Sequence, residues 1–355
     1  MRQKKVRNPL RKRLIRELIG DWKKYLVVAL FLILTIGFVS GMYVANGSMM
    51  QAAEEGVTRY KLEDGHFELR DKADAQLLSA IETGEKADVR QYYLDEAKKK
   101  LDEKFEREFK EKEACAKAYD TAYQEGYDKA WKKAKDKIEE KYADAEEKYE
   151  LNDPDFQVNP VHVYENFYRN EDEDYNNDGK NDGTIRVFAK TDEINLACLL
   201  EGGFPEKENE IAIDRMHADN VGIKVGDTVT VSGTKYQVTG LIAYVNYATL
   251  HEKTTDLMFD ALKFDVAMVT PEAFDRLKKS VHYTYAWQYE DEPLDDTQEK
   301  AKSDDFMKAL LTQVVTADNE LEDYTPKYAN PAINFATDDM GSDEAMGGVL
   351  LDILI

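Results

Sequence analysis

The chain has 355 residues, a formal net charge of −23 and two cysteines, Cys115 and Cys198. This length allows one or two domains. The acidity argues against nucleic acid as a partner, because proteins that bind phosphate backbones carry basic surfaces. Two cysteines form no disulfide framework, and the sequence leaves open whether they pair.

The charge is unevenly distributed along the chain. Residues 1–24 hold ten basic and two acidic side chains, so the remaining chain holds 38 basic and 69 acidic ones. Residues 25–46 carry no charge and are almost wholly apolar, and about 20 such residues in a helix span a membrane. We predict a transmembrane helix at 25–46. Because positive charge favours the cytoplasmic side, residues 1–24 are expected inside the cell and residues 47–345 outside.

Residues 1–24 have a pattern of their own. Apolar side chains recur at spacings of three and four between the basic ones, which predicts an amphipathic helix in contact with lipid on the inner leaflet. A basic flank without such a helix is the alternative. A cleaved signal peptide competes as an interpretation of the apolar stretch, but its apolar region is usually shorter, about 7–15 residues.

An extracytoplasmic α+β core is predicted for two segments, 47–87 and 155–343. In the first segment, alternation at 66–69 predicts a strand, and Asp74 in N-cap position predicts a short helix closed by Gly84. In the second segment, short apolar runs joined by tight turns predict a small, strongly curved sheet. Its predicted strands are 161–164, 184–188, 210–213, 228–231, 236–244, 264–269 and 283–289, and its predicted helices are 214–220, 272–278 and one within 295–323.

Residues 88–150 interrupt this core with a long helical pattern. Apolar residues and tyrosines recur mostly every four residues, without proline. One straight helix of this length would extend roughly 95 Å, whereas two antiparallel helices return to the core and cover each other's apolar stripes. We predict an inserted helical hairpin, a coiled coil with its turn between Lys112 and Gly126. A disordered charged linker is the alternative.

An acidic loop follows the predicted hairpin. Asp174, Asn176, Asp178 and Asp182 match ligand positions of a calcium loop, although the closing position, normally Glu, is Ile185. The sequence therefore predicts an incomplete Ca²⁺ site at these four residues. The alternative is an ordinary polar hairpin loop, which favours the same residue types.

Residues 346–355 begin a second apolar run, which we interpret as the start of a second transmembrane helix.

Three segments of the chain resemble FtsX-like and MacB-like ABC transporter permeases. They are PLRKRLIRELIGDWKKYLVVALFLILTIGFVSGMYVANGSM near the N-terminus, EGGFPEKENEIAIDRMHADNVGIKVGDTVTVSGTKYQVTGLI at 201–242, and NFATDDMGSDEAMGGVLLDILI at 334–355. The middle segment is the most specific of the three.

This resemblance implies a MacB-like periplasmic-core domain of α+β class with a β-rich subdomain, located after the first transmembrane helix. It also implies a non-catalytic permease subunit in a multi-pass cell-membrane protein. A separate cytoplasmic ABC ATPase would drive export or mechanical work on an extracellular substrate or partner, and the permease would act as a dimer or pseudo-dimer. Residues 88–150 depart from the family pattern, and we interpret them as contacting the cell wall or an extracellular protein.

Common catalytic motifs are absent from the sequence. It contains no phosphate loop, no His-Glu-x-x-His pair and no Gly-x-Ser-x-Gly elbow, so we assign no catalytic or cofactor-binding residue. A second function remains open, that of a membrane-anchored module which binds or senses a partner through its hairpin. Further spans after 346–355 would favour the permease.

Overall fold

The computed structural model describes residues 20–110, 116–149 and 151–333. The chain divides between Gly56 and Val57 into two compact units, and the second unit runs from Val57 to Ala336. The fold mixes helices and sheets, as the sequence predicted.

The first unit contains most of helix α2, Trp22–Arg59. Within the described ranges, only its stretch Trp22–Gly41 is long and apolar enough to cross a membrane, and it coincides with most of the predicted span 25–46. Its apolar side chains are exposed, as contact with lipid requires. Most of the helix predicted for 1–24, and the second span predicted at 346–355, lie outside the described residues.

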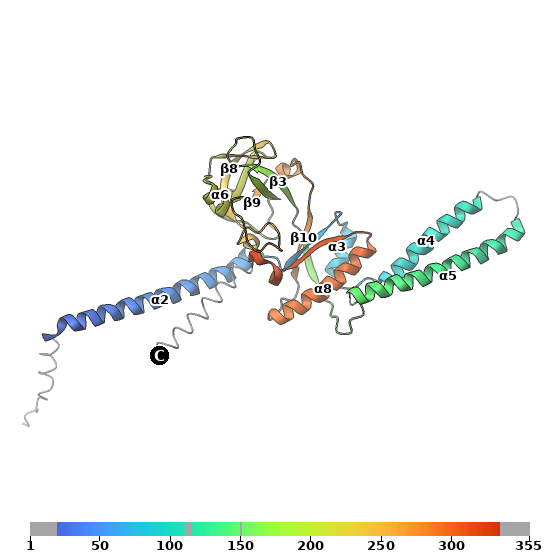
Figure 1. Cartoon of the computed structure of the whole chain (residues 1–355), viewed down its shortest axis with the longest axis horizontal. Coiled ribbons are helices and arrows are strands. Elements are labelled where there is room, and N and C mark those ends of the chain that lie inside the picture. The colour runs from blue at the N-terminus through green and yellow to red at the C-terminus, as the bar shows by residue number, and fades with distance from the viewer. Residues whose placement is uncertain (1–19, 111–115, 150, 334–355) are drawn as a thin grey trace, which may run out of the picture. The chain divides into compact units, whose positions relative to one another are not determined.

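The second unit contains an antiparallel four-stranded sheet (Figure 1). Helices α3 and α8 pack on it, and Asp74 caps α3 as predicted, accepting a hydrogen bond from the Leu77 N–H at 2.8 Å. The aromatic side chains Phe67, Trp287 and Phe306 fill the core between sheet and helices. In their order across the sheet the strands are β11 (Leu321–Pro326), β1 (Gly65–Leu69), β10 (Tyr283–Tyr289) and β2 (Val161–Glu165), and the helices are α3 (Ala75–Glu82) and α8 (Asp296–Thr316).

The other sheet of this unit closes into a barrel. Six strands form a ring in the order β8, β6, β9, β4, β3 and β7, because β7 pairs again with β8, and β5 extends the edge of β8. Gly240 permits β8 to approach the Gly203 backbone closely, because a Cβ there would lie 2.5 Å from the Gly203 carbonyl oxygen. The elements are β3 (Tyr168–Asp174), β4 (Gly183–Ala189), β5 (Cys198–Gly202), β6 (Glu210–Asp214), α6 (Arg215–Val221), β7 (Thr228–Val231), β8 (Thr234–Ala243), η1 (Val245–Tyr247), β9 (Phe264–Val269), α7 (Pro271–Asp275) and, outside the barrel, η2 (Lys327–Ala329).

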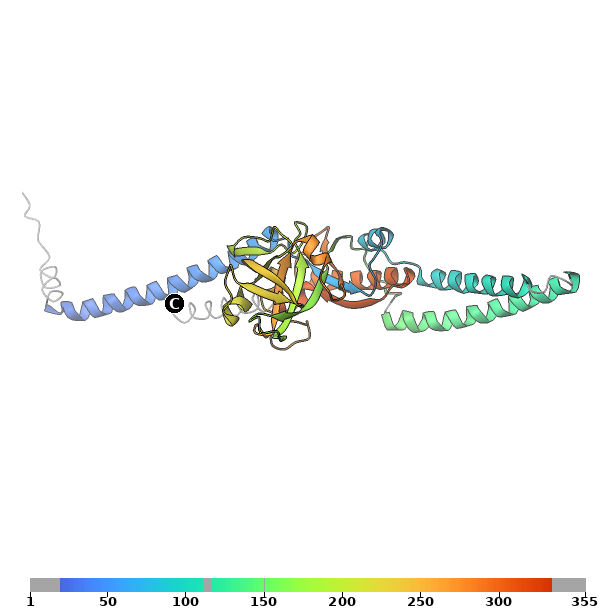
Figure 2. The same cartoon turned by 90° about the horizontal axis from the view of Figure 1, so that it is seen from above.

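Helices α4 (Val89–Lys110) and α5 (Ala116–Tyr149) form the inserted antiparallel hairpin that the sequence predicted (Figure 2). Near one end, Arg90 Nε donates to Glu139 Oε1 at 3.1 Å. Near the other end, the Phe105 ring packs edge-on against Tyr123, with centroids 5.2 Å apart. The tyrosines therefore contribute to the seam. The predicted turn region extended to Gly126, but α5 already begins at Ala116.

Three strands were not predicted, and each for a local reason. The sequence of β3, YRNEDED, is strongly polar, and we assigned its end to the acidic loop. β5 is short and ends in glycine, and β11 ends in proline at the edge of its sheet. The predicted helix 272–278 is also too long, because α7 ends at Asp275.

Candidate functional site

The end of α2 is hydrogen-bonded to the connection between β4 and β5. The Leu196 N–H donates to the Tyr60 carbonyl at 2.8 Å, and the Asn195 N–H donates to the Lys61 carbonyl at 3.0 Å. The Asn195 side chain accepts from the Glu63 N–H at 3.1 Å and donates to Glu63 Oε2 at 2.5 Å. Both side chains are buried. We call residues 60–63 and 195–196 the α2 joint.

The chain enters and leaves the second unit at neighbouring points. β1 and β11 are antiparallel, with Gly65 opposite Pro326. Just outside this pair, the Lys327 N–H donates to the Asp64 carbonyl at 2.8 Å, and Lys327 Nζ lies 3.6 Å from Asp64 Oδ1. The residues just before β1 and just after β11 are therefore held side by side.

A polar cleft of about 430 Å³ lies between the four-stranded sheet and the barrel. Glu68 on β1 bridges it: its Oε1 lies 2.6 Å from His282 Nδ1, and its Oε2 accepts from the Tyr168 hydroxyl on β3 at 3.1 Å. Burial raises the pKa of Glu68, but the hydrogen bonds from His282 and Tyr168 outweigh it, so that the pKa is lowered. The cleft is therefore crossed by an ionised bridge between the two sheets.

Arg186 forms the barrel wall of this cleft. Its guanidinium donates to the Asn170 side chain at 3.0 Å, to the Tyr247 hydroxyl at 2.9 Å and to the Glu252 carbonyl at 3.0 Å. Its Cζ lies 4.2 Å from the Tyr168 ring centroid, a favourable cation–π distance. Since every guanidinium nitrogen has a protein partner, this residue fixes the wall of the cleft.

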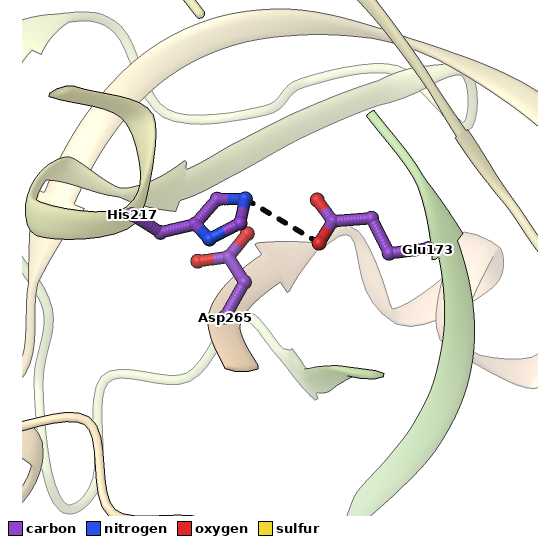
Figure 3. Close-up of side chains that lie close together, drawn as sticks. All are labelled: Glu173, His217 and Asp265. Atoms are coloured by element: carbon purple, nitrogen blue, oxygen red, sulfur yellow. Dashed lines mark ion pairs between the residues drawn. The ribbon is translucent and has the colours of Figure 1, made fainter. Parts of the chain in front are cut away.

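Three ionisable side chains meet inside the barrel (Figure 3). Glu173 extends from β3, His217 from α6 and Asp265 from β9, all with no exposed surface. One ligand atom of each lies within 4.8 Å of the others. His217 Nε2 is 3.4 Å from Glu173 Oε2, and His217 Nδ1 is 2.9 Å from the Ala261 carbonyl oxygen. We call Glu173, His217 and Asp265 the barrel cluster.

The barrel cluster is short of hydrogen bonds. Both oxygens of Glu173, Oδ2 of Asp265 and Nε2 of His217 have no hydrogen-bond partner among the described residues. Burial lowers the pKa of His217, but the carboxylates of Asp265 and Glu173 raise it to about 9. Burial also raises the pKa of Asp265, against the lowering effect of His217. The cluster therefore requires protons or a bound cation to balance its charge.

The four residues of the predicted Ca²⁺ site lie at the end of β3 and in its connection to β4. Asp174 Oδ1 accepts from the Asp178 N–H at 3.0 Å, and Asp178 Oδ2 is paired with Lys180 Nζ at 3.1 Å. Asn176 accepts from the same Asp178 N–H at 2.8 Å, while Asp182 Oδ2 has no hydrogen-bond partner within the described chain. These contacts close a hairpin turn, and the Ca²⁺ site stays a prediction.

Sequence reasoning missed the barrel cluster. Its members lie more than forty residues apart, so no spacing connects them. The one local signal is Asp265, a charged residue inside the apolar strand FDVAMV, because a buried carboxylate requires a partner.

Cys198 accepts a hydrogen bond from the Tyr60 hydroxyl at 2.9 Å. Cys115 lies outside the described residues, so the question of a disulfide stays open.

No protein-family model and no curated protein matches the chain. Among solved structures, it is similar to the periplasmic region of MacB from Actinobacillus actinomycetemcomitans, with 10% identity over 48% of this chain and 73% of that one, at a TM-score of 0.27. It is also similar to the extracellular domain of the noncanonic ABC-type transporter YknZ from Gram-positive bacteria, with 14% identity over 49% and 86%, at a TM-score of 0.28. The first of these neighbours is a periplasmic region and the second is an extracellular domain.

Proposed function

We propose that this chain is a permease subunit of an ABC transporter of the FtsX/MacB type. It couples ATP hydrolysis by a separate cytoplasmic ATPase to export, or to mechanical work on an extracellular substrate or partner. The observation that carries this proposal is the adjacency of β1 and β11, by which the second unit starts and ends at one place. The apolar stretch Trp22–Gly41, with its basic flank, supports a position in the cell membrane.

The α2 joint is the element through which motion would reach the extracytoplasmic unit. Displacement of the chain at Tyr60 would pull on Asn195, and thereby on the barrel, through four hydrogen bonds. The same displacement would reach the four-stranded sheet, because β1 begins two residues after Glu63. In this mechanism the chain transmits force and needs no catalytic residue.

The cleft provides the second part of this mechanism. Glu68 connects the two sheets through its contact with Tyr168 on β3. His282, the residue before β10, holds the other oxygen of Glu68, and the interior of each sheet is tightly packed. Relative motion within the unit would concentrate at this junction, because packed cores deform less readily. Besides the Glu68 contact, Phe167 and the backbone pairing of Tyr168 with His282 join the two sheets there.

A second candidate function is an anchored binding or sensing module that acts through the hairpin. The observation that favours it is the length of α4 and α5, which extend 22 and 34 residues and carry mostly charged, exposed side chains. In either function this hairpin would contact a cell-wall component or an extracellular protein.

The decisive experiment is purification of the full-length protein from membranes in mild detergent, followed by an ATPase assay. The permease predicts a stoichiometric ABC ATPase in the complex and an activity that falls when Asn195 is replaced by aspartate, although the complex itself persists. Replacement of the exposed Asn209 by aspartate is the matched control and should leave the activity unchanged.

Absence of an ATPase under conditions that preserve membrane complexes would contradict the permease. The anchored module would then be tested by deletion of 88–150, which should abolish binding to intact cell walls or to the surface partner.

A further inference from the structure

We propose that the barrel cluster, Glu173, His217 and Asp265, is a structural site for a divalent transition-metal ion of the Mn²⁺ to Zn²⁺ series. This proposal goes beyond the transport function and does not depend on it. The three ligands come from β3, α6 and β9, so one ion would tie together three separate elements of the barrel.

Two glutamates on β3, Glu171 and Glu173, differ in their hydrogen bonding. Glu171 and Glu173 are both fully buried and stand two residues apart, so they share one face of the strand. Glu171 is saturated, because it accepts from the Ser232 hydroxyl and, at 2.9 Å each, from the N–H groups of Lys278 and Lys279. Glu173 has no hydrogen-bond donor on either oxygen within the described part of the chain. A buried, ionised carboxylate without hydrogen-bond donors is stable only beside a cation.

The orientation of His217 fits a metal ligand. The Ala261 carbonyl can only accept, so Nδ1 carries a proton and donates to it at 2.9 Å. A backbone carbonyl on the far nitrogen is a common way of fixing a metal-binding histidine, and it leaves the Nε2 lone pair free. Nε2 faces Glu173 Oε2 at 3.4 Å, and two ligands about 2.0–2.1 Å from one tetrahedral ion are separated by roughly 3.3 Å.

The charge balance supports the same assignment. Two buried carboxylates and a neutral imidazole have a net charge of −2, which one divalent ion neutralises without any exposed counter-charge. Mixed imidazole and carboxylate donors suit first-row transition metals. Ca²⁺ and Mg²⁺ are less suited, because they require six or more ligands, mostly oxygen. Bidentate binding by Glu173 would supply the fourth ligand, since both of its oxygens are available.

The rival state of the cluster contains protons in place of a metal. In that state an imidazolium pairs with Glu173, and Asp265 is protonated. Both states are neutral, so metal content and metal-dependent stability must distinguish them. Because the cluster is fully buried, the ion would enter as the barrel folds.

The test uses the full chain in detergent, purified from cells grown with added Mn²⁺ or Zn²⁺ and dialysed against a chelator at low temperature. Metal content is measured by mass spectrometry, and the melting temperature is measured with and without chelator. The variants are Glu173→Gln and Asp265→Asn, and Glu171→Gln is the control with the same residue type, strand and burial.

The parent chain and Glu171→Gln are expected to retain about one ion per chain, and heating with chelator should lower their melting temperature. Glu173→Gln and Asp265→Asn should bind the ion roughly 100-fold more weakly or worse, and chelator should not affect their melting. A parent chain without retained metal, whose melting is indifferent to chelator, would overturn the proposal. Retention of metal by both variants would overturn it as well.

If the variants do not fold, binding of Co²⁺ by the parent chain tests the metal site instead. Incorporation during growth should give the visible absorption of a low-symmetry, nitrogen- and oxygen-ligated Co²⁺ ion. No bound Co²⁺, or the spectrum of the hydrated ion, would refute the site. In that case the cluster is the protonated ion pair.

Discussion

Replacing Asn195 by aspartate should loosen the α2 joint, although the two side chains have nearly the same shape. One aspartate oxygen can still accept from the Glu63 N–H, but the other replaces an amide that donates to Glu63 Oε2. Asn195 has φ of 49°, in the left-handed region, and aspartate tolerates this conformation nearly as well as asparagine. The substitution therefore isolates the loss of one charge-assisted hydrogen bond and the approach of a second carboxylate.

The free-energy cost of Asn195→Asp is the sum of these two effects. A buried hydrogen bond to a charged group contributes about 1.5–3 kcal/mol. Two carboxylates at about 4 Å repel by about 4 kcal/mol at an effective dielectric constant near 20, although uptake of one proton limits this cost. We expect Asn195→Asp to destabilise the α2 joint by about 3 kcal/mol in total at pH 7. The cost should shrink as the pH falls towards about 4, because one shared proton restores a hydrogen bond between the two groups.

Hydrogen exchange of the full chain in detergent measures this effect. The amides of Glu63, Asn195 and Leu196 report the joint directly, and a loss of 3 kcal/mol corresponds to exchange on the order of 100-fold faster. Asn209→Asp is the control, because its side chain is exposed. Unchanged protection at the three amides in Asn195→Asp, or equal loosening by the control, would refute the assignment of the joint.

Three further predictions concern the second unit. Burial lowers the pKa of His66, but the Glu63 carboxylate raises it more, so the net shift is upward. The protonated His66 therefore stabilises the fold fully below about pH 6.5, and this stabilisation is lost as the pH rises through the folded-state pKa. In thermal melts, the melting temperature of His66→Gln should lack this pH dependence. Trp287→Ala should cost about 3–5 kcal/mol in denaturant unfolding, since the side chain is fully buried. Tyr127→Phe removes a hydrogen bond to Asp102 and should destabilise the hairpin by about 0.5–1.5 kcal/mol, seen as earlier melting of helical circular dichroism.

Each of these predictions has a clear contrary result. A parent protein whose stability does not fall above pH 6.5 would contradict the role of His66. A Trp287→Ala variant within about 1 kcal/mol of the parent would mean that the aromatic core is not cooperative with the sheet. For Tyr127→Phe, unfolding of the whole second unit rather than of the hairpin alone would contradict local action.

Several helices and strands of this chain could be predicted from the sequence because their signals are local. The apolar stretch at 25–46, the four-residue spacing in 88–150 and the Asp74 cap each lie within one segment, and the structure has a helix at each place. The strands around 210–213 and 236–244 were likewise predicted from short runs and turns. In each case, the signal lies in the type and spacing of neighbouring residues.

Strand β3 could not be predicted in this way, because its sequence YRNEDED has the composition of a loop. Only closure of the barrel places Glu171 against the Lys278 N–H and Glu173 against His217. The partners that make a buried carboxylate tolerable come from elements far away in the chain.

By itself, then, the sequence determined the membrane helix, the hairpin and most elements of the α+β unit, since each depends on periodicity within one segment. Tertiary structure alone decided the α2 joint, the cleft and the barrel cluster. Each of these unites residues from separate elements, such as Glu63 with Asn195 and Glu173 with Asp265. Burial and hydrogen bonding between distant segments are set by how the strands close, and no local pattern in the chain records that closure.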